Sequence, residues 1–293
     1  MTRAIIAAAL ALLPLAGPAG QTPSGRPQPA RSPRLYVFDC GILDAGDPAR
    51  YELKKEEVDT DRFSVACFLV AHPKGTLMWD VGAVPDTAWK ATGSAIRQRL
   101  VLPDSQERFV TVVKPLRAQL AETGYRPPDV THLAVSHYHW DHTANANDFA
   151  TATWLVRQVE REAMFAPKAP PVALPATYAA LEKSKTTIIK SDEHDVFGDG
   201  TVLIKSAPGH TPGHQVLYVK LAQTGGVVLS GDLYHYPQER TLNRYPTFEF
   251  NREGTAASRA AVDAFLKKTG AQFWIQHDFI ANARLKKAPA YYE

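Results

Sequence analysis

The chain has 293 residues, of which 45% are hydrophobic and 22% are charged, and its formal net charge is +3. This length and apolar content suffice for a layered α/β enzyme with a sizeable buried core. The near balance of charge, without a basic stripe, argues against a nucleic-acid-binding protein.

The N-terminal residues 1–20 have the layout of a secretory signal peptide. Arg3 supplies a positive charge, an apolar run follows over residues 4–15, and small residues occupy 16–20. The alternative, a buried or anchoring helix, is disfavoured because the run is short for a bilayer. We therefore expect a periplasmic or secreted protein without a membrane anchor. Residues 21–34 are rich in Pro, Ser, Gly and Gln and are predicted to be a flexible N-terminal segment.

Residues 35–293 are predicted to form a single domain in which helices separate clusters of strands. Apolar residues at spacings of three and four indicate helices at 109–123, which Pro115 disturbs, and at 253–268; a further helix is expected at 160–165. Strands are predicted at 35–39, 63–71, 76–81, 130–135, 154–156, 187–189, 202–206, 215–220, 226–230 and 273–275, with a hairpin turn at 72–75. This order favours two sheets sandwiched between helices.

The two cysteines, Cys40 and Cys67, allow two interpretations. Export would permit a disulfide between them. Their apolar neighbourhoods, YVFDC and VACFLV, equally suit two buried free thiols. Their spacing is not that of a metal knuckle or a redox pair.

The strongest chemical signal is the segment HYHWDH at 137–142, directly after a predicted strand. Residues two apart on a strand face the same way, so His137 and His139 can converge on one point. The following loop can turn Asp141 and His142 toward a second point nearby. Imidazoles and carboxylates are the ligands expected for zinc or similar divalent ions. Four such residues in so short a segment predict a metal site.

Further ligands are expected at the ends of later strands. His210 lies in the tight turn PGHTPGH, Asp232 follows the apolar run of LSGD, and His277 follows that of FWIQH. A glycine- and proline-rich turn holds its side chains in fixed directions. Each residue alone is weak evidence, but all three at strand ends and in this order favour a second group of ligands.

The HYHWDH segment resembles the HxHxDH motif of the metallo-β-lactamase superfamily, and the later ligands follow in the same order. The resemblance covers nearly all of the chain from Leu35 and implies an αββα four-layer sandwich. It implies two divalent metal ions, with zinc expected and manganese, iron or cobalt as alternatives. Asp232 would bridge them, and His214 would support the site without binding metal. By motif position, the first metal would be held by His137, His139 and His210, and the second by Asp141, His142 and His277.

Several segments are similar to the N-acyl homoserine lactonases of this superfamily: CGILD at 40–44, WDVG at 79–82 and GHTPGHQ at 209–215. True β-lactamases of the superfamily generally lack the bridging acid at Asp232. The implied activity is the opening of the lactone ring of N-acyl homoserine lactones, which is quorum quenching, by a metal-bridging hydroxide. Asp141 is the candidate for carrying the proton to the leaving oxygen.

The chain departs from the lactonases at one position. Several of them have a tyrosine three residues after the bridging acid, where it is proposed to assist the substrate carbonyl. Here His235 occupies that position, between Tyr234 and Tyr236. Tyr234 and His235 are therefore the candidate catalytic hydrogen-bond donors beside Asp141 and Asp232.

The expected partner is a small-molecule lactone, without nucleic acid or membrane in the mature form, and a homodimer is left open. An acyl chain needs an apolar groove, for which Trp140, the loop 167–175 and the segment 245–250 are candidates. The nearest alternative is a hydrolase of the same fold acting on other lactones, esters or β-lactams. A metal-dependent sensor without turnover is a second alternative, against which the full set of seven ligands argues.

Overall fold

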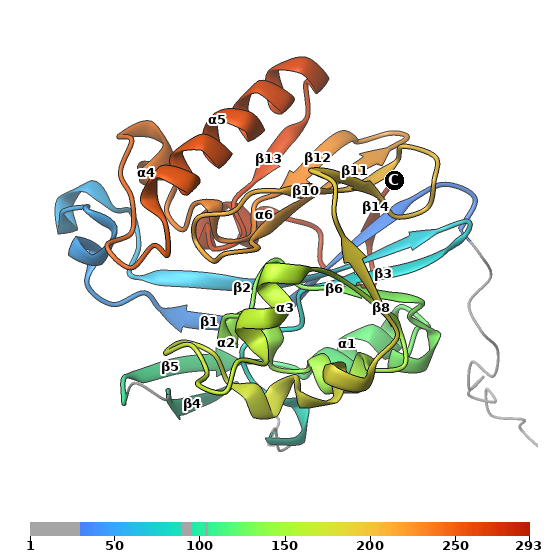
Figure 1. Cartoon of the computed structure of the whole chain (residues 1–293), viewed down its shortest axis with the longest axis horizontal. Helices are drawn as coiled ribbons and strands as arrows, with labels where there is room; N and C mark the ends of the chain where they lie inside the picture. The colour runs from blue at the N-terminus through green and yellow to red at the C-terminus, as the bar shows by residue number, and fades with distance from the viewer. Residues whose placement is uncertain (1–29, 89–94, 103–104) are drawn as a thin grey trace, which may run out of the picture.

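Two sheets face each other at the centre of the computed structural model, which describes residues 30–88, 95–102 and 105–293 (Figure 1). The larger has the order β4-β5-β1-β2-β3-β6-β7-β8, with β14 paired to β1, and the smaller the order β13-β12-β11-β10-β9. The larger sheet comprises β1 (Arg34–Asp44), β2 (Arg62–His72), β3 (Gly75–Trp79), β4 (Ile96–Val101), β5 (Glu107–Val112), β6 (His132–Ala134), β7 (Thr153–Arg157), β8 (Thr186–Ile189) and β14 (Tyr291–Tyr292). The smaller comprises β9 (Glu193–Asp195), β10 (Val202–Ser206), β11 (Gln215–Leu221), β12 (Gly225–Leu229) and β13 (Gln272–Trp274).

The space between the sheets is filled by apolar side chains from both. Leu35 and Val37 of β1 face this inner core, where they meet residues such as Ile204 of β10. The alternate residues of the same strand, Tyr36 and Phe38, belong to the core on the other face of the larger sheet. This alternation follows from the two-residue period of a strand. Because β1 buries both faces, it reads as a continuous apolar run.

Helices cover the two outer faces, so the predicted four-layer αββα sandwich is confirmed. On the larger sheet, α1 (Leu116–Glu122) and α3 (Gln158–Met164) contribute Leu120 and Met164 to the outer core. On the smaller sheet, α5 (Arg252–Thr269) packs Val262 and Leu266 against β11 and β12. Figure 1 shows α5 above the small sheet and α1 and α3 below the large one. Three shorter helices are α2 (Trp140–Thr143), α4 (Pro237–Thr241) and α6 (Phe279–Arg284).

The predicted strands occur with small shifts of their ends, and the hairpin turn at 72–75 joins β2 to β3. The helix predicted at 109–123 is wrong over its first half. Residues of β5 pair instead with β1 and β4, and α1 begins only after Pro115, which is its N-cap. The apolar residues of β5 lie in a strand because the neighbouring strands form hydrogen bonds with its backbone. The proline limits how far the following helix extends toward the N-terminus.

The predicted signal peptide, residues 1–20, lies outside the described residues, as does most of the segment 21–34. The last residues of the segment 21–34 contact the domain: Ala30 is buried, and the Ser32 hydroxyl donates a hydrogen bond to the Glu293 carboxylate. None of the helices in the described ranges combines the length and apolar character that a bilayer crossing needs.

Cys40 of β1 and Cys67 of β2 form a disulfide, and both are buried. This decides between the two interpretations that their neighbourhoods allowed. The bond joins adjacent strands of the larger sheet close to its centre, where the two Cα atoms lie 6.0 Å apart.

We predict that the Cys40→Ala, Cys67→Ala double variant will lose about 3 to 4 kcal/mol of unfolding free energy. The bond separates 27 positions in sequence, and a link of that span restricts the unfolded chain by about this amount. Guanidinium denaturation of the oxidised wild type and the variant measures the difference. Equal stability, or two free thiols titrated in the unfolded wild type without reductant, would contradict the disulfide.

Candidate metal centre

The seven predicted ligands converge at one edge of the sandwich, although they come from four separate segments. The segment 137–142 follows β6 and leads into α2. His210 lies in the turn between β10 and β11, and Asp232 and His277 follow the parallel strands β12 and β13. Because the C-terminal ends of parallel strands meet at one sheet edge, their following residues are brought together. Both sheets therefore contribute to the centre.

The seven predicted ligands form two buried clusters that could each hold a metal ion. Within each cluster, one ligand atom from every residue lies within 4.8 Å of the others. The first cluster is His137, His139, His210 and Asp232, and the second is Asp141, His142 and His277. All seven side chains are buried. This grouping matches the division between two metal ions that the motif positions implied.

Asp232 directs one carboxylate oxygen toward each cluster. Its Oδ1 lies 3.1 Å from Nε2 of His142 and 3.1 Å from Nε2 of His277. Its Oδ2 lies 3.5 Å from Nε2 of His137 and 3.4 Å from Nε2 of His210. The carboxylate therefore lies between the two histidine groups, which is the place that a bridging ligand requires. Its bridging role itself stays a prediction.

The outer nitrogens of the histidines are held by fixed partners, which turns the inner nitrogens toward Asp232. Nδ1 of His142 lies 2.9 Å from the Asp80 carboxylate, and Nδ1 of His277 lies 2.8 Å from the carbonyl of Ser64. Nδ1 of His210 faces Glu249 at 3.3 Å. Such partners fix the ring orientation and tautomer of metal-binding histidines.

Several inner atoms have no hydrogen-bond partner among the described residues. Nε2 of His137, Nε2 of His142 and Oδ1 of Asp232 are buried in this state. Leaving buried polar atoms unpaired costs free energy, which a coordinated cation would offset. The donor set of imidazoles and carboxylates suits zinc and similar divalent ions. The residues present therefore fit divalent metal ions, with one group of candidate ligands in each cluster.

Asp80 is a supporting residue that the sequence did not single out. It is fully buried at the end of β3 and accepts hydrogen bonds from Ser136 N at 2.6 Å, from Nε2 of Gln276 at 2.6 Å, and from His142. Its φ of +54° is rare for a residue with a side chain. Asp80 thus connects the loops on either side of the centre. The only feature of the sequence that could have indicated this role is the position of Asp80 in WDVG, at the end of an apolar strand.

Glu160 of α3 connects two ligand loops and was likewise missed. Its buried carboxylate accepts hydrogen bonds from Tyr138 N at 2.8 Å, from the Thr211 hydroxyl at 2.9 Å and from Gly213 N at 2.7 Å. Burial raises the pKa of Glu160 to about 7, against these donors. The carboxylate therefore holds the loop of His137 and the turn of His210 against each other.

The turn around His210 depends on glycine. Gly209 has a φ of +140°, and a Cβ there would collide with the backbone of Thr255 in α5. Glycine alone accommodates both the backbone angle and this close approach. The turn can therefore pack directly onto α5, which fixes the direction of the His210 side chain.

His214 supports the centre from outside the clusters, in agreement with the sequence analysis. Its Nδ1 donates to the carbonyl of Ala207 at 2.9 Å, and its Nε2 accepts from Asp232 N at 3.0 Å. Burial, together with the nearby His210, lowers the pKa of His214 to about 4. The neutral ring therefore fixes the backbone of Asp232.

A cavity of about 370 Å³ opens over the two clusters. Its apolar wall contains the predicted groove residues: Trp140, Pro171 and Val172 from the proline-rich loop, and Phe248 and Phe250. Phe250 is 66% exposed, so it stands at the mouth. We call these apolar residues the apolar rim; they share the cavity with the two buried clusters and with the charged residues Asp44, Arg50 and Arg108.

Tyr234, His235 and Tyr236, which follow Asp232 and Leu233, take different directions. His235 lines the cavity. Tyr234 does not; its ring packs against Phe273 and under the guanidinium of Arg259. Tyr236 lines a different cavity. Tyr51, which follows β1 and was not identified from the sequence, lines the main cavity with its ring 4.9 Å from that of His235.

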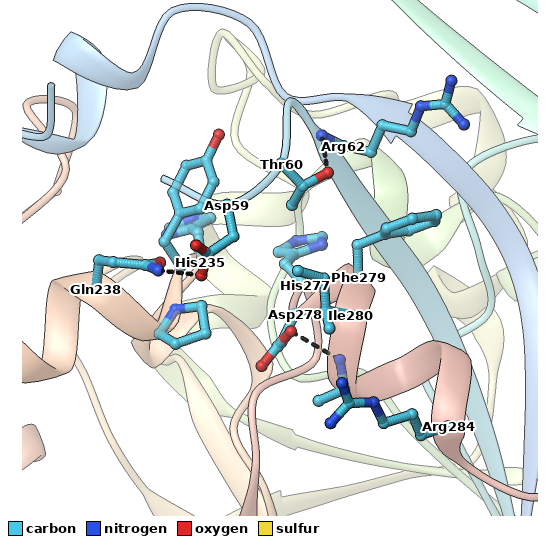
Figure 2. Close-up of a pocket in the computed structure, with 13 residues that line it drawn as sticks. Asp59, Thr60, Arg62, His235, Gln238, His277, Asp278, Phe279, Ile280 and Arg284 are labelled. Carbon is cyan, nitrogen blue, oxygen red and sulfur yellow. Dashed lines mark hydrogen bonds between the residues drawn. The ribbon is translucent and has the colours of Figure 1, made fainter. Parts of the chain in front are cut away.

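The second cavity, of about 180 Å³, lies between the segment 59–62, α4 and α6. We name it the side cavity. Figure 2 shows His235 and His277 facing it, with Arg284 on one side and, on the other, Gln238, whose side-chain amide donates a hydrogen bond to the Asp59 carboxylate. His235 and His277 line both cavities, and their rings stack 5.6 Å apart. These two rings therefore form part of the wall between the cavities.

We predict that His214 makes the protein acid-labile. Its folded pKa lies below the ordinary value of 6.5, so below pH 6.5 the unfolded chain binds a proton that the native ring does not. This contribution to stability is complete above pH 6.5 and is lost as pH falls toward 4, by up to about 3 kcal/mol.

Urea denaturation of chelator-treated wild type and His214→Gln between pH 4 and 7 measures this effect. Glutamine can keep a donor and an acceptor but does not titrate. We expect the stability of the variant to fall less steeply with acidity. Parallel curves for the two proteins would show that His214 is not the responsible group.

The family described as the metallo-beta-lactamase superfamily matches residues 60–271. The N-acyl homoserine lactonase AttM of Azorhizobium caulinodans is 29% identical over 276 residues, which cover 89% of this chain and 98% of the relative. The N-acyl homoserine lactonase AiiA of Bacillus thuringiensis subsp. kurstaki is 26% identical over 232 residues, covering 78% of this chain and 86% of the relative.

Solved structures show the same fold at lower identity. An N-acyl homoserine lactone hydrolase with the product N-hexanoyl-L-homoserine at its catalytic metal centre has a TM-score of 0.72 and 21% identity, covering 88% of this chain and 98% of that one. AidC, described as a dizinc quorum-quenching lactonase, has a TM-score of 0.63 and 17% identity, covering 89% and 94%. Since the family match spans most of the chain and the four-layer fold agrees with it, the chain belongs to the metallo-β-lactamase superfamily.

Proposed function

We propose that this protein is a metal-dependent hydrolase that opens the lactone ring of N-acyl homoserine lactones. The observation that carries the proposal is the pair of ligand clusters, with Asp232 between them, at the floor of a cavity with an apolar rim. The similarity to N-acyl homoserine lactonases over nearly their whole length supports the same substrate class.

The clusters would hold two divalent ions, and zinc is the ion we propose. Such ions supply an activated water and polarise the ester carbonyl, and attack by a hydroxide between them is part of the proposal. The chain's own residues set the geometry: Asp80 and Glu249 orient His142 and His210. Asp141 lies in the cavity wall with Oδ2 3.5 Å from Nε2 of His277. It is placed to carry a proton to the leaving alkoxide.

The apolar rim is the proposed binding surface for the acyl chain. Trp140, Val172 and Phe248 lie on the same cavity that contains the ligands. Each methylene buried there contributes about 0.8 kcal/mol to binding. A substrate with a polar ring ester and an apolar tail matches this division, because the ester reaches the floor while the tail stays at the rim.

The deciding experiment is hydrolysis of N-hexanoyl homoserine lactone by the zinc-loaded protein, followed by proton release, with a cephalosporin assayed beside it. We expect lactone opening that stops on chelation and returns on adding zinc. A series of acyl chains should show KM falling with length until the rim is filled. Cephalosporin cleavage without lactone opening would transfer the protein to the β-lactam alternative.

Asp232→Ala and His139→Ala are the matched variants for this assay. Each removes one inner ligand, so we expect kcat to fall at least about 100-fold and the metal content, measured by atomic absorption, to drop. A variant with full activity would refute the assignment of the centre.

We also propose that the protein is exported. Support comes from the order of charge, apolar run and small residues in 1–20, and from the Cys40–Cys67 disulfide, which oxidising compartments favour. Fractionation of cells expressing the full chain tests this. The expected result is a shortened protein in the periplasm or medium; full-length protein in the cytoplasm would argue against export.

A further inference from the structure

Arg50 places a positive charge beside the apolar rim of the main cavity. It lies in the short 3-10 helix η1 (Pro48–Tyr51), which follows β1, and it lines the same cavity as the ligand clusters. Its guanidinium carbon lies 4.8 Å from the ring centroid of Phe248. Arginine stays charged at any ordinary pH, and a purely apolar acyl chain could not pair with it. The proposed function therefore leaves this cation unexplained.

The backbone of Arg50 is fixed to the segment that carries Phe248. The Arg50 carbonyl accepts hydrogen bonds from Thr247 N at 2.8 Å and from the Thr247 hydroxyl at 3.2 Å. Two residues further along the chain, both carboxylate oxygens of Glu52 accept hydrogen bonds from the guanidinium of Arg252. These bonds connect the two segments on either side of Phe248. They hold the start of the Arg50 side chain beside the rim.

The guanidinium of Arg50 has no acidic partner within the described ranges. It contacts the ring of Phe248, and among the described residues it makes neither an ion pair nor a hydrogen bond. Asp44 and Glu52, two acids close to it in the sequence, are each bound to another arginine. A ring covers one face of a guanidinium, whereas the N–H groups lie in its plane. These donors are therefore free to bind a ligand in the cavity.

One aromatic ring separates this cation from the metal centre. The ring of Phe248 lies 6.0 Å from that of the ligand His210 on one side and contacts Arg50 on the other. A molecule that reaches from the clusters to Arg50 needs an ester at one end, a few methylenes over the rim and an acceptor group at the other end. A carboxylate fits best, because its two oxygens match the fork of a guanidinium.

We propose that Arg50 is a specificity-determining residue that binds a carboxylate at the far end of the acyl chain, so that the preferred substrates are N-acyl homoserine lactones with an anionic tail. The inference deepens the proposed lactone hydrolysis and rests on it for the ester end of the substrate. The carboxylate accepts two hydrogen bonds from the guanidinium, and the methylenes before it lie over the apolar rim.

Two substrates and three variants test this proposal. N-hexanoyl homoserine lactone is compared with the analogue in which a carboxylate replaces the terminal methyl group. Arg50→Met keeps a long side chain beside Phe248 without the charge, and Arg50→Lys keeps the charge without the planar fork. Arg62→Met is the matched control, because Arg62 is an exposed arginine that lines the side cavity instead (Figure 2).

For the zinc-loaded wild type we expect KM to be about tenfold lower for the carboxylate analogue than for the hexanoyl lactone, since hydrogen bonds between charged groups contribute this much to binding. The kcat values should agree within about threefold, because the carboxylate is remote from the reacting ester. Arg50→Met should lose the preference, and Arg50→Lys should retain about threefold of it. Arg62→Met should keep the wild-type ratio of KM values.

A second readout needs no turnover. Hexanoate and adipate, which differ by the same replacement, are titrated into the cobalt-loaded proteins while the visible spectrum is recorded. One carboxylate of each acid can occupy the metal centre, and only adipate has a second one for Arg50. Adipate should bind the wild type about tenfold more tightly than hexanoate does, and Arg50→Met should bind the two alike. The difference should shrink in about 0.5 M salt, which screens the charge pair.

A wild type that opens both lactones with equal KM would overturn the role of Arg50 and leave the proposed function standing, as would an Arg50→Met variant that keeps the preference. Loss of the preference in Arg62→Met would also overturn it, because the preference would then reflect the overall charge of the protein. A wild type inactive on both lactones refutes the proposed function, and the comparison of adipate with hexanoate then still decides for or against Arg50.

Discussion

One buried carboxylate, that of Asp232, is the constraint on which the centre depends. Burial alone would raise its pKa, but His277 and His142 more than offset this and hold the pKa of Asp232 well below its usual range. A charged group in such a place needs partners on every side. The histidines of both clusters supply them, and the strand ends of two sheets must meet around it. The four-layer fold brings these strand ends together.

The ligands sit on loops, and loops alone do not hold a geometry. Three buried carboxylates from elsewhere in the chain help to fix them: Asp80 lies beside His142, Glu249 beside His210, and Glu160 between the two ligand loops. His277 is held instead by the carbonyl of Ser64. Glu239 likewise accepts a hydrogen bond from the backbone N–H of His235. Acidic side chains suit this task because one carboxylate accepts several backbone or side-chain donors at once.

The local sequence was sufficient to predict the site where metal-binding residue types directly follow an apolar strand pattern. HYHWDH concentrates four ligands after an apolar strand, and His210, Asp232 and His277 each end an apolar run, so the clusters could be assembled from the sequence. The supporting acids could not, because an isolated Glu160 or Glu239 in a helix resembles any solvated residue until the fold buries it.

The error at 109–123 has a related cause. The apolar spacing there fits a helix, but the residues belong to two elements, β5 and the start of α1. Local periodicity does not reveal that β5 pairs with β1, which is distant in sequence. Side-chain direction was equally hidden: Tyr234 and His235 are adjacent, yet Tyr234 packs beneath Arg259 while His235 faces the cavity.

The division of the ligands between both sheets links cofactor supply to the lifetime of the folded protein. The first cluster joins residues after β6 of the large sheet to residues after β12 of the small one, so the sheets cannot separate while an ion is held. An ion at about 1000 times its dissociation constant adds about 4 kcal/mol to the stability of the native state. A shortage of metal should therefore abolish the activity of this protein and also shorten its lifetime in the presence of proteases. The amount of the protein then becomes a measure of the available metal.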